Sequence, residues 1–120
     1  MRFQDGAHEK RYYELLSRMA YVDCYHKAVA YLMALRIMRP DDIFDFAEDV
    51  ILHDGLHEPW QTHSSRSATR LAFNLWNSCM VDDERVDAPI SPLYSIDYIF
   101  SNDEWAPYFH EAINIRFDRV

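Results

Sequence analysis

Apolar side chains recur along most of the chain at the spacing of an α-helix. Near the N-terminus they fall at i, i+3, i+4 and i+7, which predicts a helix over residues 7–19. The next stretch, residues 24–38, is apolar on most sides, and Asp23 before it is a suitable N-cap. A helix of this kind is normally buried, so we expect it at the centre of the fold. The apolar positions of the first helix are Tyr12, Leu15, Leu16 and Met19.

A third helix is predicted from Pro40, because proline suits the first turn of a helix. Asp41 and Asp42 follow it, where carboxylates interact favourably with the positive end of the helix dipole. We expect no strand in this region or elsewhere in the chain. The buried stripe of the third helix is predicted to be Ile43, Phe46, Ala47, Val50 and Ile51.

The remaining helices follow two breaks in the pattern. After the histidine-rich segment 53–63, a fourth helix is predicted to end near residue 77. The stretch 81–92 is polar and acidic and holds two prolines, so we expect a mobile surface loop. Pro92 and Pro107 then mark the starts of two last helices. The expected caps of the fourth helix are Ser64, Ser65 or Ser67, and its expected inward side chains are Ala68, Leu71, Ala72 and Leu75. The apolar residues of the last two helices are Leu93, Ile96, Phe100, Phe109, Ala112, Ile113 and Phe117.

This pattern predicts one compact all-α domain over residues 1–120, with five or six helices and one histidine-rich loop. The helices at 24–38 and 66–77 are expected in its core. A chain of 120 residues is long enough for one core and too short for two. Only two glycines occur, which disfavours turn-rich β-architectures and any glycine-lined phosphate loop.

The net charge of −8 argues against a nucleic-acid-binding surface, because affinity for phosphate comes from clustered Lys and Arg. The charge suits a partner with a basic face, and the alternative is that acidity only keeps a small protein soluble. No apolar run approaches the roughly 20 residues of a membrane span, and the N-terminus has no signal-peptide core. We therefore expect a cytoplasmic protein of a bacterial cell, with Cys24 and Cys79 as free thiols.

Candidate chemistry lies in the segment HDGLHEPWQTH, residues 53–63. His53, His57 and His63 offer three imidazoles, which zinc binds readily. A structural zinc site is closed by four ligands. Cys79 is the softest candidate for the fourth, and Asp54 or Glu58 is the nearest in sequence. The sequence thus predicts one structural zinc. It leaves open the alternative of three solvated histidines in a loop.

The same segment resembles part of the metzincin signature HExxHxxGxxH, with which all three histidine positions coincide. This resemblance implies a zinc hydrolase in which Asp54 activates a water molecule. Asp54 stands where the signature has its longer catalytic Glu, and Trp60 stands where it has Gly. Both differences disfavour an enzyme, because Asp54 reaches a bound water less well and Trp60 removes a flexible turn.

No complete nucleophilic site is evident elsewhere in the sequence. Cys24 and His26 are close in sequence but point about 200 degrees apart on a helix, so they do not form a dyad. Cys79 follows an apolar face, which is typical of a small core residue. His8, His26 and His110 are expected in ordinary surface or core-edge positions.

Four blocks carry a wider resemblance: DCYHKAVAYL (23–32), DGLHEPWQT (54–62), RLAFNLWN (70–77) and APYFHEAI (106–113). They resemble a family of short, functionally uncharacterised proteins encoded by phages and mobile elements of Firmicutes. The resemblance covers nearly the whole chain. It implies a setting in which small acidic proteins often inhibit host defence, as anti-CRISPR proteins do. The family has no established catalytic residues, so none is transferred.

These observations predict a non-enzymatic interaction protein, most concretely an anti-CRISPR-type inhibitor that binds a type II RNA-guided nuclease and blocks DNA loading. The partner is expected to be a host defence nuclease with a basic surface, since the nucleic-acid channel of such an effector is positively charged. We expect no membrane contact and no direct nucleic-acid contact. The alternatives are a small zinc-dependent hydrolase and a helical domain without metal. The expected contact residues are Asp82, Asp83, Glu84 and Asp87, with Trp60 as an aromatic anchor.

Overall fold

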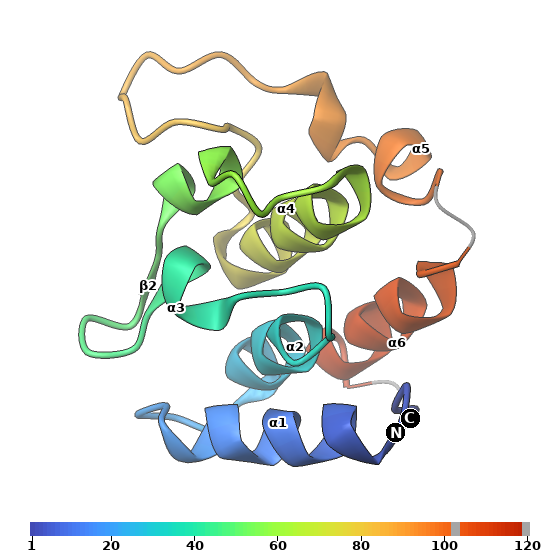
Figure 1. The fold of residues 1–120 in the computed structure, drawn as a ribbon. Helices are drawn as coiled ribbons and strands as arrows, with labels where there is room; N and C mark the ends of the chain where they lie inside the picture. The colour runs from blue at the N-terminus through green and yellow to red at the C-terminus, as the bar shows by residue number, and fades with distance from the viewer. Residues whose placement is uncertain (102–103, 119–120) are drawn as a thin grey trace.

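Six α-helices and one short hairpin make up the part of the fold that the computed structural model describes, residues 1–101 and 104–118 (Figure 1). The predicted all-α single domain is confirmed. None of these helices combines the length and the apolar character needed to cross a membrane. The α-helices are α1 (Gly6–Ser17), α2 (Cys24–Met33), α3 (Pro40–Ile43), α4 (His63–Asn77), α5 (Ile96–Ile99) and α6 (Ala106–Arg116). The other elements are the strands β1 (Phe44–Asp45) and β2 (Val50–Ile51) and the 3₁₀ helices η1 (His53–His57) and η2 (Pro92–Tyr94).

Helix α2 lies at the centre of the molecule and packs against α1, α4 and α6 (Figure 1). Every residue from Ala28 to Leu35 is buried. The small side chains of Ala28 and Ala30 allow close approach of neighbouring helices, and the larger ones fill the space between them. Each fully buried large apolar side chain contributes roughly 1.5–3 kcal/mol, so this helix is a main source of stability. Its predicted central position is confirmed.

Asp23 caps α2 as predicted, because its carboxylate accepts the backbone N–H of His26 at 2.9 Å. The helix ends at Met33, earlier than the predicted residue 38. Beyond its end the chain closes tighter turns, in which an N–H binds the carbonyl three residues before it. Pro40 then holds Arg39 in an extended conformation, which separates α2 from α3.

The prediction of a long third helix without strands is wrong, because α3 ends after one turn at Ile43. The chain continues into an antiparallel hairpin in which Phe44 pairs with Ile51. The carboxylate of Asp45 accepts backbone N–H groups two and three residues further on, a turn that competes with helix formation. Asp49 closes the turn in the left-handed conformation, with φ 59°. Ile43 and Ile51 of the predicted buried stripe are buried, but Ala47 and Val50 are exposed, so their predicted inward positions are wrong.

The N-cap of α4 is Thr62, two residues before Ser64, the first of the expected caps. The Thr62 side chain accepts the backbone N–H of Ser65, and the Ser65 hydroxyl accepts the backbone N–H of Thr62 at 2.7 Å. This reciprocal arrangement satisfies two N–H groups at the helix start. Ser78 ends the helix in the left-handed conformation, with φ 64°. That reversal sets the direction in which the following segment leaves.

The C-terminal region differs from the prediction at two apolar positions. Ser95 separates η2 from α5 and caps α5 by accepting the backbone N–H of Tyr98. In the resulting register Ile99 is buried, whereas Ile96, an apolar residue of the predicted fifth helix, is exposed. Phe117, predicted as part of the last helix, lies just beyond the end of α6 and is also exposed.

Candidate functional site

Three segments far apart in the sequence converge on the thiol of Cys79. The chain reverses at Ser78, and Cys79 Sγ then lies 3.3 Å from Nε2 of His53 at the start of η1. The hydroxyl of Tyr94, from η2, lies 3.5 Å from the same sulfur. Cys79 is half-buried rather than a core residue. The structure thus places a thiol, an imidazole and a phenol in one cluster, which we call the thiol cluster.

The second ring nitrogen of His53 faces the acidic loop, defined as residues 81–90. Nδ1 lies 3.6 Å from Oε1 of Glu84. Nδ1 is buried, and among the described residues no atom makes a hydrogen bond to it. When Nε2 accepts a hydrogen bond from the thiol, Nδ1 carries the proton and directs it towards this carboxylate. The His53 side chain is 13% exposed, so solvent screens this interaction only in part.

The other two predicted zinc-binding histidines lie elsewhere. His57 is exposed on η1, and its Nε2 is 3.7 Å from Oδ1 of Asp83. His63 opens α4 and its ring nitrogens lie 3.3 Å from the hydroxyls of Tyr98 and Ser101. Helix α4 has 15 residues and therefore spans about 22 Å. His63 and the thiol cluster are at opposite ends of this helix.

The four predicted zinc ligands therefore do not form one group. Within residues 1–101 and 104–118, no three His, Cys, Asp or Glu side chains are arranged to hold a metal ion. The metzincin spacing also assumes an α-helix, whereas η1 is a 3₁₀ helix in which residues four apart do not share a face. Only His53 and Cys79 of the predicted set meet, and zinc binding stays a prediction from the sequence.

A bidentate ion pair anchors the acidic loop to α4. Nε and Nη2 of Arg70, on α4, lie 3.0 Å and 3.1 Å from the two carboxylate oxygens of Asp82. The Arg70 side chain is 6% exposed and that of Asp82 is 23% exposed. A bidentate pair of this kind fixes the orientation of both side chains. Asp82, predicted as a contact residue, is therefore directed inwards and anchors the loop.

Residues 83–87 of the acidic loop all face solvent, and the loop runs around the outside of the helical body (Figure 1). Asp83, Glu84 and Asp87 are all exposed. Between them Val86 has a relative exposure of 108%, and Ile90 follows with 68%. Apolar side chains surrounded by carboxylates match the layout of a protein interface, which has an apolar centre and a polar rim.

Trp60, the predicted anchor, lies beside α3. Its Nε1 donates a hydrogen bond of 2.8 Å to Oδ2 of Asp42. The guanidinium of Arg39 lies over its ring, 5.8 Å from the centroid. The ring is half-buried and packs against the core. These contacts give Trp60 a structural role in joining η1 to α3, and sequence alone could not show them.

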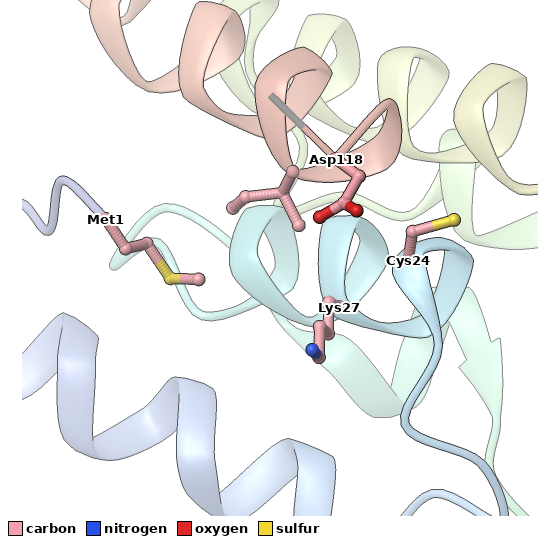
Figure 2. A pocket seen from close by; sticks show the side chains of 5 residues that line it. Met1, Cys24, Lys27 and Asp118 are labelled. Atoms are coloured by element: carbon pink, nitrogen blue, oxygen red, sulfur yellow. The ribbon is translucent and has the colours of Figure 1, made fainter. Parts of the chain in front are cut away.

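A surface cavity of about 290 Å³ lies between α2, α6 and the N-terminus. Figure 2 shows that the side chains of Cys24 and Lys27 point away from each other there, with Met1 and Asp118 on opposite sides. The charged groups do not converge on one point, in contrast to the thiol cluster. The cavity therefore presents no candidate reaction centre.

Residues 1–120 of the chain match a family of unknown function, DUF6075. The chain belongs to this family. No match was found among curated proteins or among solved structures. The predicted resemblance to a functionally uncharacterised family is confirmed over the whole chain. Because DUF6075 has no described activity, the roles of residues in this member rest on its own geometry.

This DUF6075 member buries two histidines that the sequence placed at the surface or core edge. His8, on α1, is fully buried. Its Nε2 donates to the carbonyl of Tyr31 at 2.9 Å, and its Nδ1 accepts the backbone N–H of Gln4 at 2.9 Å. Burial lowers the pKa of His8 below its usual value, because a charged ring would be poorly solvated there. The neutral ring satisfies both neighbours.

His26 is the second buried histidine, and it lies between two carboxylates. Its Nδ1 is 2.7 Å from Oδ1 of Asp23, and its Nε2 is 2.8 Å from Oδ1 of Asp49. Desolvation acts to raise the pKa of Asp23, but the hydrogen bonds from the backbone N–H and ring of His26 lower it overall. The spacing of three residues between Asp23 and His26 is a sequence signal for the contact between their side chains. Asp49 is too distant in sequence to have been one.

Proposed function

We propose that this protein is a non-enzymatic interaction protein that binds a basic surface of its partner through the acidic loop. The observation that carries the proposal is an exposed apolar residue, Val86, on a loop that Asp82 and Arg70 attach to the core. An anchored loop loses less conformational entropy on binding than a free one. A partner pocket that takes up Val86 would remove its apolar surface from water.

The charge of the loop indicates what kind of surface it fits. It carries four carboxylates and one guanidinium, and the whole chain has a net charge of −8. A basic partner is therefore attracted before contact, which raises the rate of association. Because the Debye length is about 8 Å at physiological ionic strength, this attraction weakens as salt is added.

The most concrete partner is a type II RNA-guided nuclease, bound inside a bacterial cell by an anti-CRISPR-type inhibitor of phage or mobile-element origin. Such a nuclease holds its heteroduplex in a positively charged channel. An acidic domain that occupies this channel competes with DNA for the same cationic side chains. This mode of inhibition requires no reaction, and the resemblance to proteins of mobile elements supplies its biological setting.

The test measures loading of labelled DNA onto a purified guide-loaded nuclease while this protein is added. We expect inhibition that saturates at about one equivalent of this protein per nuclease, because an inhibitor that only binds does not turn over. The variant Glu84→Gln/Asp87→Asn removes two charges of the loop and should weaken inhibition about tenfold. The matched control Glu9→Gln/Glu14→Gln removes two exposed charges of α1 and should change it less than about twofold.

Absence of both co-purification and inhibition at about tenfold excess would show that the nuclease proposal is wrong. The zinc-hydrolase alternative predicts a different result: inhibition at substoichiometric amounts, abolished by Asp54→Asn. Such a hydrolase would need His53 and His63 on one ion, yet α4 separates them. This separation favours the interaction protein over the enzyme.

A further inference from the structure

We propose that Cys79 is a reactive thiol that His53 activates for exchange with small-molecule disulfides, which makes Cys79 a site of reversible S-thiolation. The thiol cluster has the parts that such chemistry requires: a nucleophile, a base within reach and a third group that orients the base. Sγ of Cys79 and Nε2 of His53 are 3.3 Å apart. This property does not depend on partner binding by the acidic loop.

Glu84 orients the ring of His53 towards the thiol. Glu84 lies 3.6 Å from Nδ1, so the ring proton is favoured on Nδ1 and the lone pair of Nε2 faces the thiol. After Nε2 has taken up the thiol proton, the ring is positively charged. Glu84 then stabilises this charge across the same short distance. The buried Nδ1 has no competing hydrogen bond within the described residues.

Tyr94 stabilises the sulfur once its proton has left. Its hydroxyl is 3.5 Å from Sγ and donates to the carbonyl of Val81 at 3.0 Å in the resting arrangement. Burial, followed by the hydrogen bond with Cys79, raises the pKa of Tyr94, so the phenol remains protonated and able to donate. The carbonyl of Val81, 3.2 Å from Sγ, is a second acceptor for the single thiol proton and holds the unreacted thiol when that proton is not directed at Nε2 of His53.

The exchange needs no reagent other than the disulfide itself. Nε2 of His53 takes the thiol proton while Sγ attacks one sulfur of the disulfide, and a new S–S bond forms to Cys79. The old S–S bond breaks, and its electron pair leaves with the other sulfur. The protonated His53 returns the proton to this leaving thiolate. The products are a mixed disulfide on Cys79 and one free small thiol, and excess thiol reverses the reaction.

The closing experiment uses the full chain with Cys24→Ser, so that Cys79 is the single thiol, and a neutral dipyridyl disulfide as the probe. The absorbance of released thiopyridone gives the second-order rate constant at pH 7. We expect His53→Gln to lower it at least about tenfold, since positioned general bases contribute about 100-fold or more. Glu84→Gln should lower it about two- to fivefold, as an exposed carboxylate partner does. Asp83→Asn, a loop charge that does not face the thiol, is the matched control and should leave it unchanged.

Equal rates, within about twofold, for the Cys24→Ser protein and its His53→Gln derivative would overturn the proposal. A thiol that reacts only after unfolding, or only after a chelator removes a metal, would overturn it as well. Mass spectrometry of the intact protein must show one adduct that a reducing thiol removes. If His53→Gln fails to fold, Tyr94→Phe serves as the second variant, because it deletes one hydroxyl and should also slow the exchange.

Discussion

Removal of the Asp82 carboxylate should destabilise the whole fold, although Asp82 lies in a loop. In Asp82→Ala the guanidinium of Arg70 keeps its charge but loses both hydrogen bonds, at 3.0 Å and 3.1 Å, inside a site where its side chain is 6% exposed. An uncompensated buried charge costs about 3–5 kcal/mol. Because the Asp82 side chain is 23% exposed, water reaches one side of the pair, and we expect about 3 kcal/mol.

This free energy corresponds to a large change in melting temperature. A domain of 120 residues has an entropy of unfolding of about 0.25 kcal/mol per kelvin, so Tm should fall by about 12 °C. Urea unfolding followed by circular dichroism gives the free energy directly. The exposed neighbour Asp83→Ala is the control and should change it by less than about 0.5 kcal/mol.

The double variant Arg70→Met/Asp82→Ala separates the lost pair from the unpaired charge. It should be more stable than Asp82→Ala alone, because methionine fills the site without leaving a buried cation. If Asp82→Ala loses less than about 1 kcal/mol, or if the double variant is the less stable of the two, the inferred role of the ion pair is wrong.

Two further predictions concern a glycine and a buried histidine. Gly55→Ala should destabilise the fold by about 1–3 kcal/mol, measured by urea unfolding, because a Cβ there would lie 2.2 Å from the carbonyl oxygen of Asp42. Gly6→Ala, where a Cβ would have nothing within 4 Å, is the control. Equal effects of the two substitutions would contradict the prediction. His8 should make stability depend on pH, because its folded-state pKa is lowered and the unfolded chain takes up the proton first. The contribution of neutral His8 to the free energy of unfolding is complete above about pH 6.5 and is lost as the pH falls below that value. The difference in this free energy between wild type and His8→Gln should therefore shrink from about pH 7.5 to 5.5. A difference that stays constant would contradict the prediction.

Features set by short stretches of sequence could be predicted well. The Asp23 cap and the central, buried α2 follow from local residues, because capping and helical periodicity act within a few positions. The hairpin after α3 could not be predicted in this way. Its turn depends on Asp49, which contacts His26 from 23 positions away, and Phe44, the buried residue of its first strand, lies outside the stripe with helical spacing.

In the candidate site, too, the features set by local sequence could be predicted and those set by distant contacts could not. The acidic loop was visible as a polar, proline-containing stretch, and its irregular structure is confirmed. The inward direction of Asp82 was not visible, because its partner Arg70 lies on another element. Cys79 was named only as a fourth metal ligand and otherwise as a core residue. Its contact with His53 depends on the left-handed turn at Ser78 and on the packing of η1, neither of which has a local signal.

Both described ends of the chain lie on the side of the molecule away from the acidic loop (Figure 1). Met1 and Asp118 line one cavity, and the hydroxyl of Tyr31 donates to the backbone carbonyl of Arg2, which fixes the N-terminal segment on α2. A tether joined to either end would therefore hold the protein on a sensor chip with the loop pointing into solution. A fluorescent reporter fused there would leave the same face free, so one labelled protein can serve for capture and for imaging.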